Sequence, residues 1–98
     1  MRKIIVFPKA KKDIANSMDW YKKQANEFLS NRFKVSIFES IDSLQNDEIE
    51  YAKVKLGFSR ILVKKFPYTI YFIKNEKDIC IFAVLHNKQS RLNLEGRI

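Results

Sequence analysis

The chain contains very little glycine, proline, cysteine or histidine. Its 98 residues include two Gly, two Pro, one Cys and one His. So few Gly and Pro leave no flexible linker and no Gly-rich phosphate loop, and the length suits one core, so residues 1–98 are expected to form a single domain. Cys80 alone excludes an internal disulfide, and one His with one Cys offers no metal-ligand cluster. We therefore expect no metal and no cofactor.

Long apolar runs are also absent. No run approaches the ~20 residues of a membrane span. Ile4 to Phe7 is far too short for the apolar core of a secretory signal, and lysines follow it at once. The sequence therefore predicts a cytoplasmic protein. Cys80 occupies an alternating position within an apolar segment, which is typical of a small buried core residue rather than a reactive thiol.

Acidic residues are scarce in the second half of the chain. Residues 1–50 carry nine Lys and Arg against eight Asp and Glu, whereas residues 51–98 carry ten against three. The resulting net charges of +1 and +7 add to the +8 of the whole chain. This asymmetry points to a nucleic acid, an acidic protein segment or an anionic membrane surface as partner. A solvated basic face without a partner is the alternative.

Two segments have the periodicity of amphipathic helices. The first runs from about Lys9 to Lys23, and the second from about Asn26 to Leu44 with Asn26 as a plausible N-cap. The short junction between them implies an antiparallel pair. We expect both apolar stripes to face the core; they comprise Ala10, Ile14, Met18, Tyr21 and Ala25 on the first helix, and Leu29, Phe33, Ile37, Ile41 and Leu44 on the second.

The remaining elements are predicted to be strands. Arg2 to Phe7 is a short β-rich stretch stopped by Pro8, and residues 51–57 favour an extended edge segment after an acidic loop. Three stronger runs follow, at Ile61 to Phe66, Tyr68 to Lys74 and Ile79 to His86. The order β-α-α-β-β-β predicts an α+β domain, in which the helical hairpin packs on one face of a small, mainly antiparallel sheet. The other face or its rim is expected to meet water and partners.

These residues resemble a known family. The pattern Arg60…Phe66-Pro67-Tyr68-x-Ile70-Tyr71, followed by an apolar strand that ends at His86, resembles the RelE/ParE superfamily of bacterial type II toxins. The resemblance spans essentially the whole chain, and its most specific part is Lys65 to Tyr71 with Ile79 to His86. It implies a basic toxin that is wrapped and neutralised by a cognate antitoxin in a hetero-oligomer, with no membrane partner. RelE-like members cut messenger RNA in the ribosome, and ParE-like members block DNA gyrase.

A metal-free ribonuclease needs a base, an acid and clustered cations. The resemblance gives Arg60 a catalytic position on the second strand, for which an ion pair to Glu39 or Asp42 is the structural alternative. His86 is the natural general acid or base, and a hydrogen-bonded strand cap is its alternative.

The set of nuclease residues is incomplete in this chain. Thr69 stands where family nucleases carry a third-strand Arg, and residues 87–94 contain no Tyr. We therefore favour ParE-like inhibition of gyrase by binding. A ribosome-dependent mRNA endoribonuclease and a non-toxic antitoxin-binding relative are the alternatives.

Binding residues are predicted at the basic and aromatic positions. The candidates for contact with a phosphate or an acidic target are Lys64, Lys65, Lys88 and Arg91, and the candidates for partner binding are Trp20 and Tyr71. Tyr68 and Tyr71 are three residues apart on one strand, so they should face opposite sides of the sheet and only one can be exposed.

Overall fold

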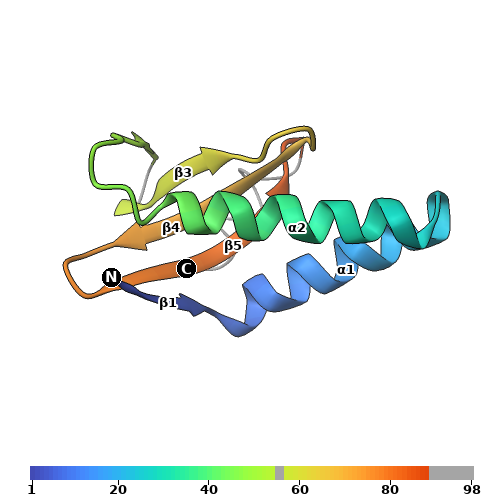
Figure 1. The fold of residues 1–98 in the computed structure, drawn as a ribbon, viewed down its shortest axis with the longest axis horizontal. Coiled ribbons are helices and arrows are strands. Elements are labelled where there is room, and N and C mark those ends of the chain that lie inside the picture. Colours follow the sequence, from blue (N-terminus) through green and yellow to red (C-terminus); the bar gives the residue numbers. More distant parts are fainter. Residues whose placement is uncertain (55–56, 89–98) are drawn as a thin grey trace.

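A computed structural model describes residues 1–54 and 57–88 and shows two helices packed on one side of a five-stranded sheet (Figure 1). The elements in chain order are β1 (Lys3–Val6), α1 (Pro8–Gln24), α2 (Glu27–Ser43), β2 (Ala52–Lys53), β3 (Ser59–Leu62), β4 (Tyr68–Lys74) and β5 (Asp78–His86). The α+β class and the order of elements are as the sequence predicts.

Both helices begin where their sequence signals indicate. Pro8 opens α1, where its missing N–H costs nothing, and Asn26 caps α2 by accepting a hydrogen bond from Leu29 N to its Oδ1 at 2.8 Å. Ser30 Oγ donates to Met18 O at 2.8 Å and joins the two helices. The predicted stripes do form the helical side of the core; its fully buried members are Ala10, Phe33, Ile37, Ile41 and Leu44. Ala25 is the exposed C-cap of α1, and Leu29 is only half-buried and is not among the residues of the core cluster.

The sheet has the order β1-β5-β4-β3-β2. β1 pairs in parallel with β5, and the other pairs are antiparallel, so the mainly antiparallel prediction is confirmed. The short β2 lies at the edge, as the extended segment was expected to do. The predicted second strand is wrong at its end: β3 stops at Leu62, because Val63 N donates to Tyr68 O at 3.0 Å and Lys65 adopts a left-handed φ of 67° in the turn.

A β-bulge shifts the alternation of β5. Tyr71 of β4 pairs in register with Ala83, and the next residue, Phe72, pairs in register with Ile81, so Phe82 is the extra residue of the bulge. Before the bulge, Ile79 and Ile81 face the helices, whereas after it Val84 does. Because of this one extra residue, each side chain of β5 after the bulge lies on the face of the sheet opposite to the one that strict alternation would give it.

The face of the sheet opposite to the helices, here the far face, has a small core of its own. Phe58, Tyr71, Ala83 and Leu85 are buried there, and the Phe82 ring lies 4.3 Å from the Phe7 ring and 5.1 Å from the Phe58 ring between centroids. The expectation that this face is left to water and partners is therefore only partly right. Among the described residues, Ala52 of β2 and Arg60 and Leu62 of β3 are exposed on this face.

Candidate functional site

Three lysines gather at the end of the sheet where β3 turns into β4 and where β5 finishes. Lys64 and Lys65 lie in the turn, Lys88 follows β5 by two residues, and all three are exposed. The two segments are joined through Asn87, whose N donates to Pro67 O at 2.9 Å and whose Oδ1 accepts from Thr69 Oγ1 at 2.6 Å. We call Lys64, Lys65 and Lys88 the basic end. Arg91, the fourth predicted cation, lies outside the described residues.

Side chains of both helices hold the turn of the basic end in place. Phe66 packs its ring edge-on against Tyr21 at 5.4 Å and Phe33 at 5.3 Å between centroids, and Ser36 Oγ donates to Lys64 O at 2.8 Å. Two charges are thereby displayed on a backbone that is held to both helices, which limits the entropy lost when a partner binds.

Trp20 lies beside this aromatic support. Its side chain is 56% exposed and stands edge-on to Tyr21, with ring centroids 5.1 Å apart. Burial raises the pKa of Tyr21, and the neighbouring Tyr68 adds to that shift. The predicted partner-binding Trp20 is thus an accessible aromatic residue near the basic end.

The predicted catalytic pair is not brought together. Arg60 pairs with Tyr71 on the far face, whereas His86 pairs with Tyr68 on the helical face. Tyr68 and Tyr71 are three positions apart on β4, so the two register positions differ by about 10 Å along the strand, in addition to two strand spacings of about 4.8 Å across the sheet. No single phosphate can contact both side chains in this arrangement.

Arg60 is exposed on the far face of β3, the strand next to the edge strand β2. Its register partners are Tyr71 on β4 and Ala52 on β2, and Leu62, 63% exposed, lies two residues further along the same face. Within residues 1–54 and 57–88 Arg60 forms no ion pair, so the expected alternative of a bridge to Glu39 or Asp42 is wrong. The guanidinium is available to an anionic partner.

His86 makes two contacts at the end of β5. Its Nδ1 accepts a hydrogen bond from Lys88 N at 3.1 Å, and its ring stands edge-on to Tyr68 at 5.3 Å between centroids. Nδ1 therefore carries a lone pair, and the imidazole caps the turn that follows β5. This is the hydrogen-bonded strand cap that the sequence left open as an alternative.

Tyr68 and Tyr71 lie on opposite faces, as predicted, yet neither is exposed. Their side chains are 7% and 5% exposed. The expectation that one of them is exposed is wrong, and because Tyr71 is buried the proposed binding surface does not include it. Cys80 is half-buried rather than fully buried, and burial raises the pKa of its thiol, which keeps it protonated and unreactive near neutral pH.

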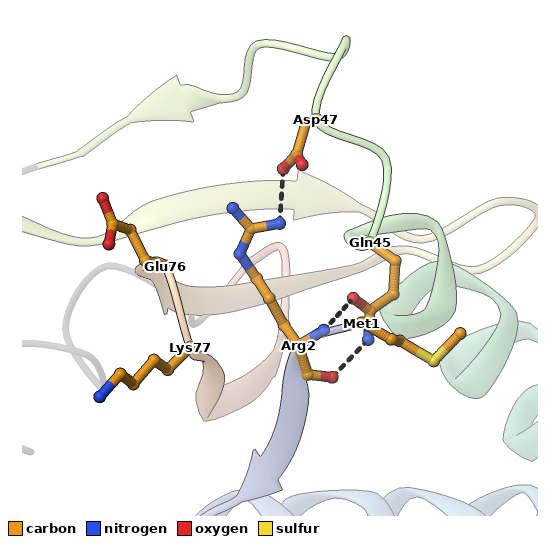
Figure 2. Close-up of a pocket in the computed structure, with 6 residues that line it drawn as sticks. All are labelled: Met1, Arg2, Gln45, Asp47, Glu76 and Lys77. Carbon is orange, nitrogen blue, oxygen red and sulfur yellow. Dashed lines mark hydrogen bonds and ion pairs between the residues drawn. The ribbon is translucent and has the colours of Figure 1, made fainter.

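A pocket of about 680 Å³ lies at the opposite end of the sheet and contains none of the predicted site residues. Figure 2 shows Arg2 reaching Asp47, with Nη1 and Oδ1 2.6 Å apart, and Gln45 forming two hydrogen bonds with the Arg2 backbone. Lys74 Nζ lies 3.1 Å from the same carboxylate. We call Arg2, Asp47 and Lys74 the Asp47 clasp, which links β1, β4 and the loop after α2. No sequence signal points to this clasp, because Asp47 is one of several acidic residues in a segment without apolar periodicity.

In the described part of the chain, no three His, Cys, Asp or Glu side chains are grouped so that they could hold a metal ion. The same residues include no helix that is both long and apolar enough to cross a bilayer. The arrangement offers binding chemistry: exposed cations on a turn held to both helices, an exposed Trp, and Arg60, which has no ion pair within residues 1–54 and 57–88.

Comparisons with known proteins agree with this fold. A family model described as the ParE toxin of the type II toxin-antitoxin system, parDE, matches residues 4–91. Among solved structures, the chain is similar to one from the chromosomal ParDE TA system of P. aeruginosa, with a TM-score of 0.77, 18% sequence identity, and coverage of 88% of this chain and 96% of that chain. At this identity the structural likeness shows the fold alone. A search of curated proteins gave no match.

Proposed function

The chain belongs to the ParE toxin family of type II toxin-antitoxin systems, and from this premise we propose that it inhibits growth by binding DNA gyrase and is neutralised by a cognate antitoxin. The observation that supports inhibition by binding is the separation of Arg60 from His86 on opposite faces of the sheet. General acid–base cleavage requires both groups within hydrogen-bond reach of one reacting ribose phosphate. Binding makes no such demand.

The basic end supports an antitoxin of complementary charge. Lys64, Lys65 and Lys88 are exposed on one rim, and Trp20 adds an exposed aromatic side chain nearby. Trp is one of the residue types most enriched among the residues that dominate binding energy at protein interfaces. Co-expression with the neighbouring reading frame is expected to give a stable hetero-oligomer, and failure to form a complex with any neighbouring product would count against this part of the proposal.

The target is tested by running two assays on the same purified protein. We expect inhibition of DNA supercoiling by gyrase, and no codon-phased cleavage of ribosome-bound messenger RNA in primer extension. Arg60→Ala should lose the inhibition, whereas His86→Gln should keep it, since His86 caps a turn. Codon-phased cleavage that disappears in His86→Gln would establish the ribonuclease instead. If expression of the free protein leaves growth unaffected, the chain is a non-toxic relative that only binds antitoxin.

A further inference from the structure

The outward side of α2 carries three apolar side chains that the described part of the chain leaves exposed. Phe28, Val35 and Phe38 are 70%, 54% and 40% exposed, although the opposite side of the same helix is buried. At about 100° per residue, Phe28 and Val35 lie nearly on one line, and Phe38 flanks it. In Figure 1 this helix crosses the sheet over β4 and β5.

Charged residues alternate with these apolar ones in a definite order. Arg32 precedes Val35, and Glu39 follows it; both are exposed and point to the same outward side. They are seven residues apart, about 10 Å along the helix axis, so they cannot pair with each other. No ion pair involves either residue within the described ranges. We call Phe28, Arg32, Val35, Phe38 and Glu39 the α2 ridge.

We infer that a second copy of this chain docks on the α2 ridge, with the two α2 helices antiparallel. Arg32 and Glu39 are equally far from the midpoint between Val35 and Ser36. A two-fold axis at that midpoint therefore places Arg32 of each copy opposite Glu39 of the other, and brings the two Val35 side chains together between these pairs. A parallel arrangement would oppose Arg32 to Arg32 and is disfavoured.

The charge of the ridge favours a second copy over an acidic antitoxin segment. Arg32 is outweighed there by Glu39 and by the exposed Asp42 on the same side of the helix, so an acidic segment gains no net attraction. The basic end, by contrast, is purely cationic. Self-association also needs no partner gene, and it does not depend on the proposed gyrase target.

The contact is expected to be weak. Three apolar side chains per copy cover much less than the ~800 Å² per partner of a standard interface. The net charge of +8 on each copy adds repulsion at long range. Dimers should therefore form at micromolar concentrations and above, rather than at nanomolar ones.

Sedimentation velocity of the full chain across the micromolar range, at physiological salt, tests the inference. We expect the mass to rise with concentration from one copy towards two. Arg32→Glu and Glu39→Arg should each weaken association by about tenfold or more, because each places like charges opposite each other twice. The double variant Arg32→Glu with Glu39→Arg should restore it. Since these residues cannot meet within one helix, only contact between copies explains the restoration.

Lys34→Glu is the matched control, because it makes the same change of charge on an exposed α2 position beside the ridge. It should leave association unweakened. Circular dichroism checks that each variant is folded, and Arg32→Gln with Glu39→Gln provide milder replacements that should weaken association less. A mass of one copy at every concentration overturns the inference, as does a dimer that both single charge reversals leave intact. If Val35→Asp abolishes antitoxin binding while no dimer forms, the ridge belongs to the antitoxin and the inference is wrong.

Discussion

Arg60 is the described residue whose surroundings most clearly favour a role in binding an anionic partner. It is exposed, has no ion pair within the described residues, and lies on the far face beside Ala52 of β2 and Leu62 of β3. Its planar guanidinium can bind a carboxylate or phosphate through two parallel hydrogen bonds, which Lys cannot reproduce. The far face thus offers one specific anion contact, whichever target the toxin acts on.

We predict that Arg60→Ala abolishes growth inhibition while changing the free energy of unfolding by no more than about 0.5 kcal/mol, as expected for an exposed surface side chain. Arg60→Lys is the control that keeps the charge, and it should recover only part of the inhibition. Growth curves after induction and thermal melts of the purified variants measure the two effects. Full toxicity of Arg60→Ala would show that Arg60 has no functional role.

The face of the sheet on which His86 lies could not be predicted from the sequence, because it depends on one extra residue in β5. Without the bulge, strict alternation would place His86 on the far face with Arg60, whereas the extra residue Phe82 moves it to the helical face beside Tyr68. The run from Ile79 to Leu85 is apolar on both faces, so no polar residue in it reveals the phase. The residue types of the site could be predicted, but their grouping depends on this bulge.

At the scale of elements, the helices could be predicted because one side of each is buried. Phe33, Ile37 and Ile41 repeat every four residues and are all buried, so their periodicity directly reports the packing. The end of β3 could not be predicted. Val63 to Phe66 has an apolar residue at each end of a lysine pair and resembles a strand, yet the left-handed Lys65 turns the chain. A Lys in that conformation gives no sequence signal, because Gly is the usual residue there.

The cap of α2 provides a prediction for the helical hairpin. Asn26→Ala removes the side-chain acceptor for Leu29 N and is expected to lower the free energy of unfolding by about 1 kcal/mol. Asn26→Asp retains the acceptor and should preserve stability. Urea denaturation followed by circular dichroism measures the change. An exposed Asn inside α1 supplies a control, because Asn16→Ala should be neutral or slightly stabilising. Equal effects at both positions would contradict the capping role.

For the molecule as a whole, the Asp47 clasp makes stability depend on pH. The hydrogen bond from Lys74 is the main cause that lowers the pKa of Asp47, and the charge of Arg2 lowers it further. A lowered pKa in the folded protein means that the clasp stabilises the fold at pH values above the ordinary carboxyl range. That stabilisation is lost as the pH falls through the pKa of the folded protein.

We therefore predict that wild type has a higher melting temperature than Asp47→Asn at pH 7, and that this difference shrinks as the pH falls below about 4. The effect is expected to be small, because the carboxylate is exposed and salt screens it. Thermal melts of both proteins at matched ionic strength test this. The exposed Asp19→Asn is the control, since among the described residues Asp19 forms an ion pair only with Lys23 of the same helix. A difference that grows as the solution is acidified would contradict the sign of the shift.

The last prediction concerns the net charge of +8. It distinguishes attraction of the antitoxin by the total charge of the chain from direct contact with the lysines of the basic end. If an acidic antitoxin is attracted only by overall charge, any three lysines are equivalent. If it contacts the basic end, reversing Lys64, Lys65 and Lys88 to Glu should matter most. Reversing Lys9, Lys11 and Lys12 at the start of α1 gives a control with an identical net charge, since three reversals change +8 to +2 in either variant.

We predict that the triple reversal at the basic end weakens antitoxin binding by about tenfold or more at physiological salt, and that the α1 reversal weakens it by much less, since exposed contacts contribute about 0.2–1 kcal/mol each. Raising the salt concentration should reduce the difference between the two variants, because salt screens the attraction between the exposed lysines of the basic end and an acidic antitoxin. Equal loss in both variants would show that the antitoxin responds to total charge, and that the three lysines fixed between β3, β4 and β5 are an ordinary solvated rim.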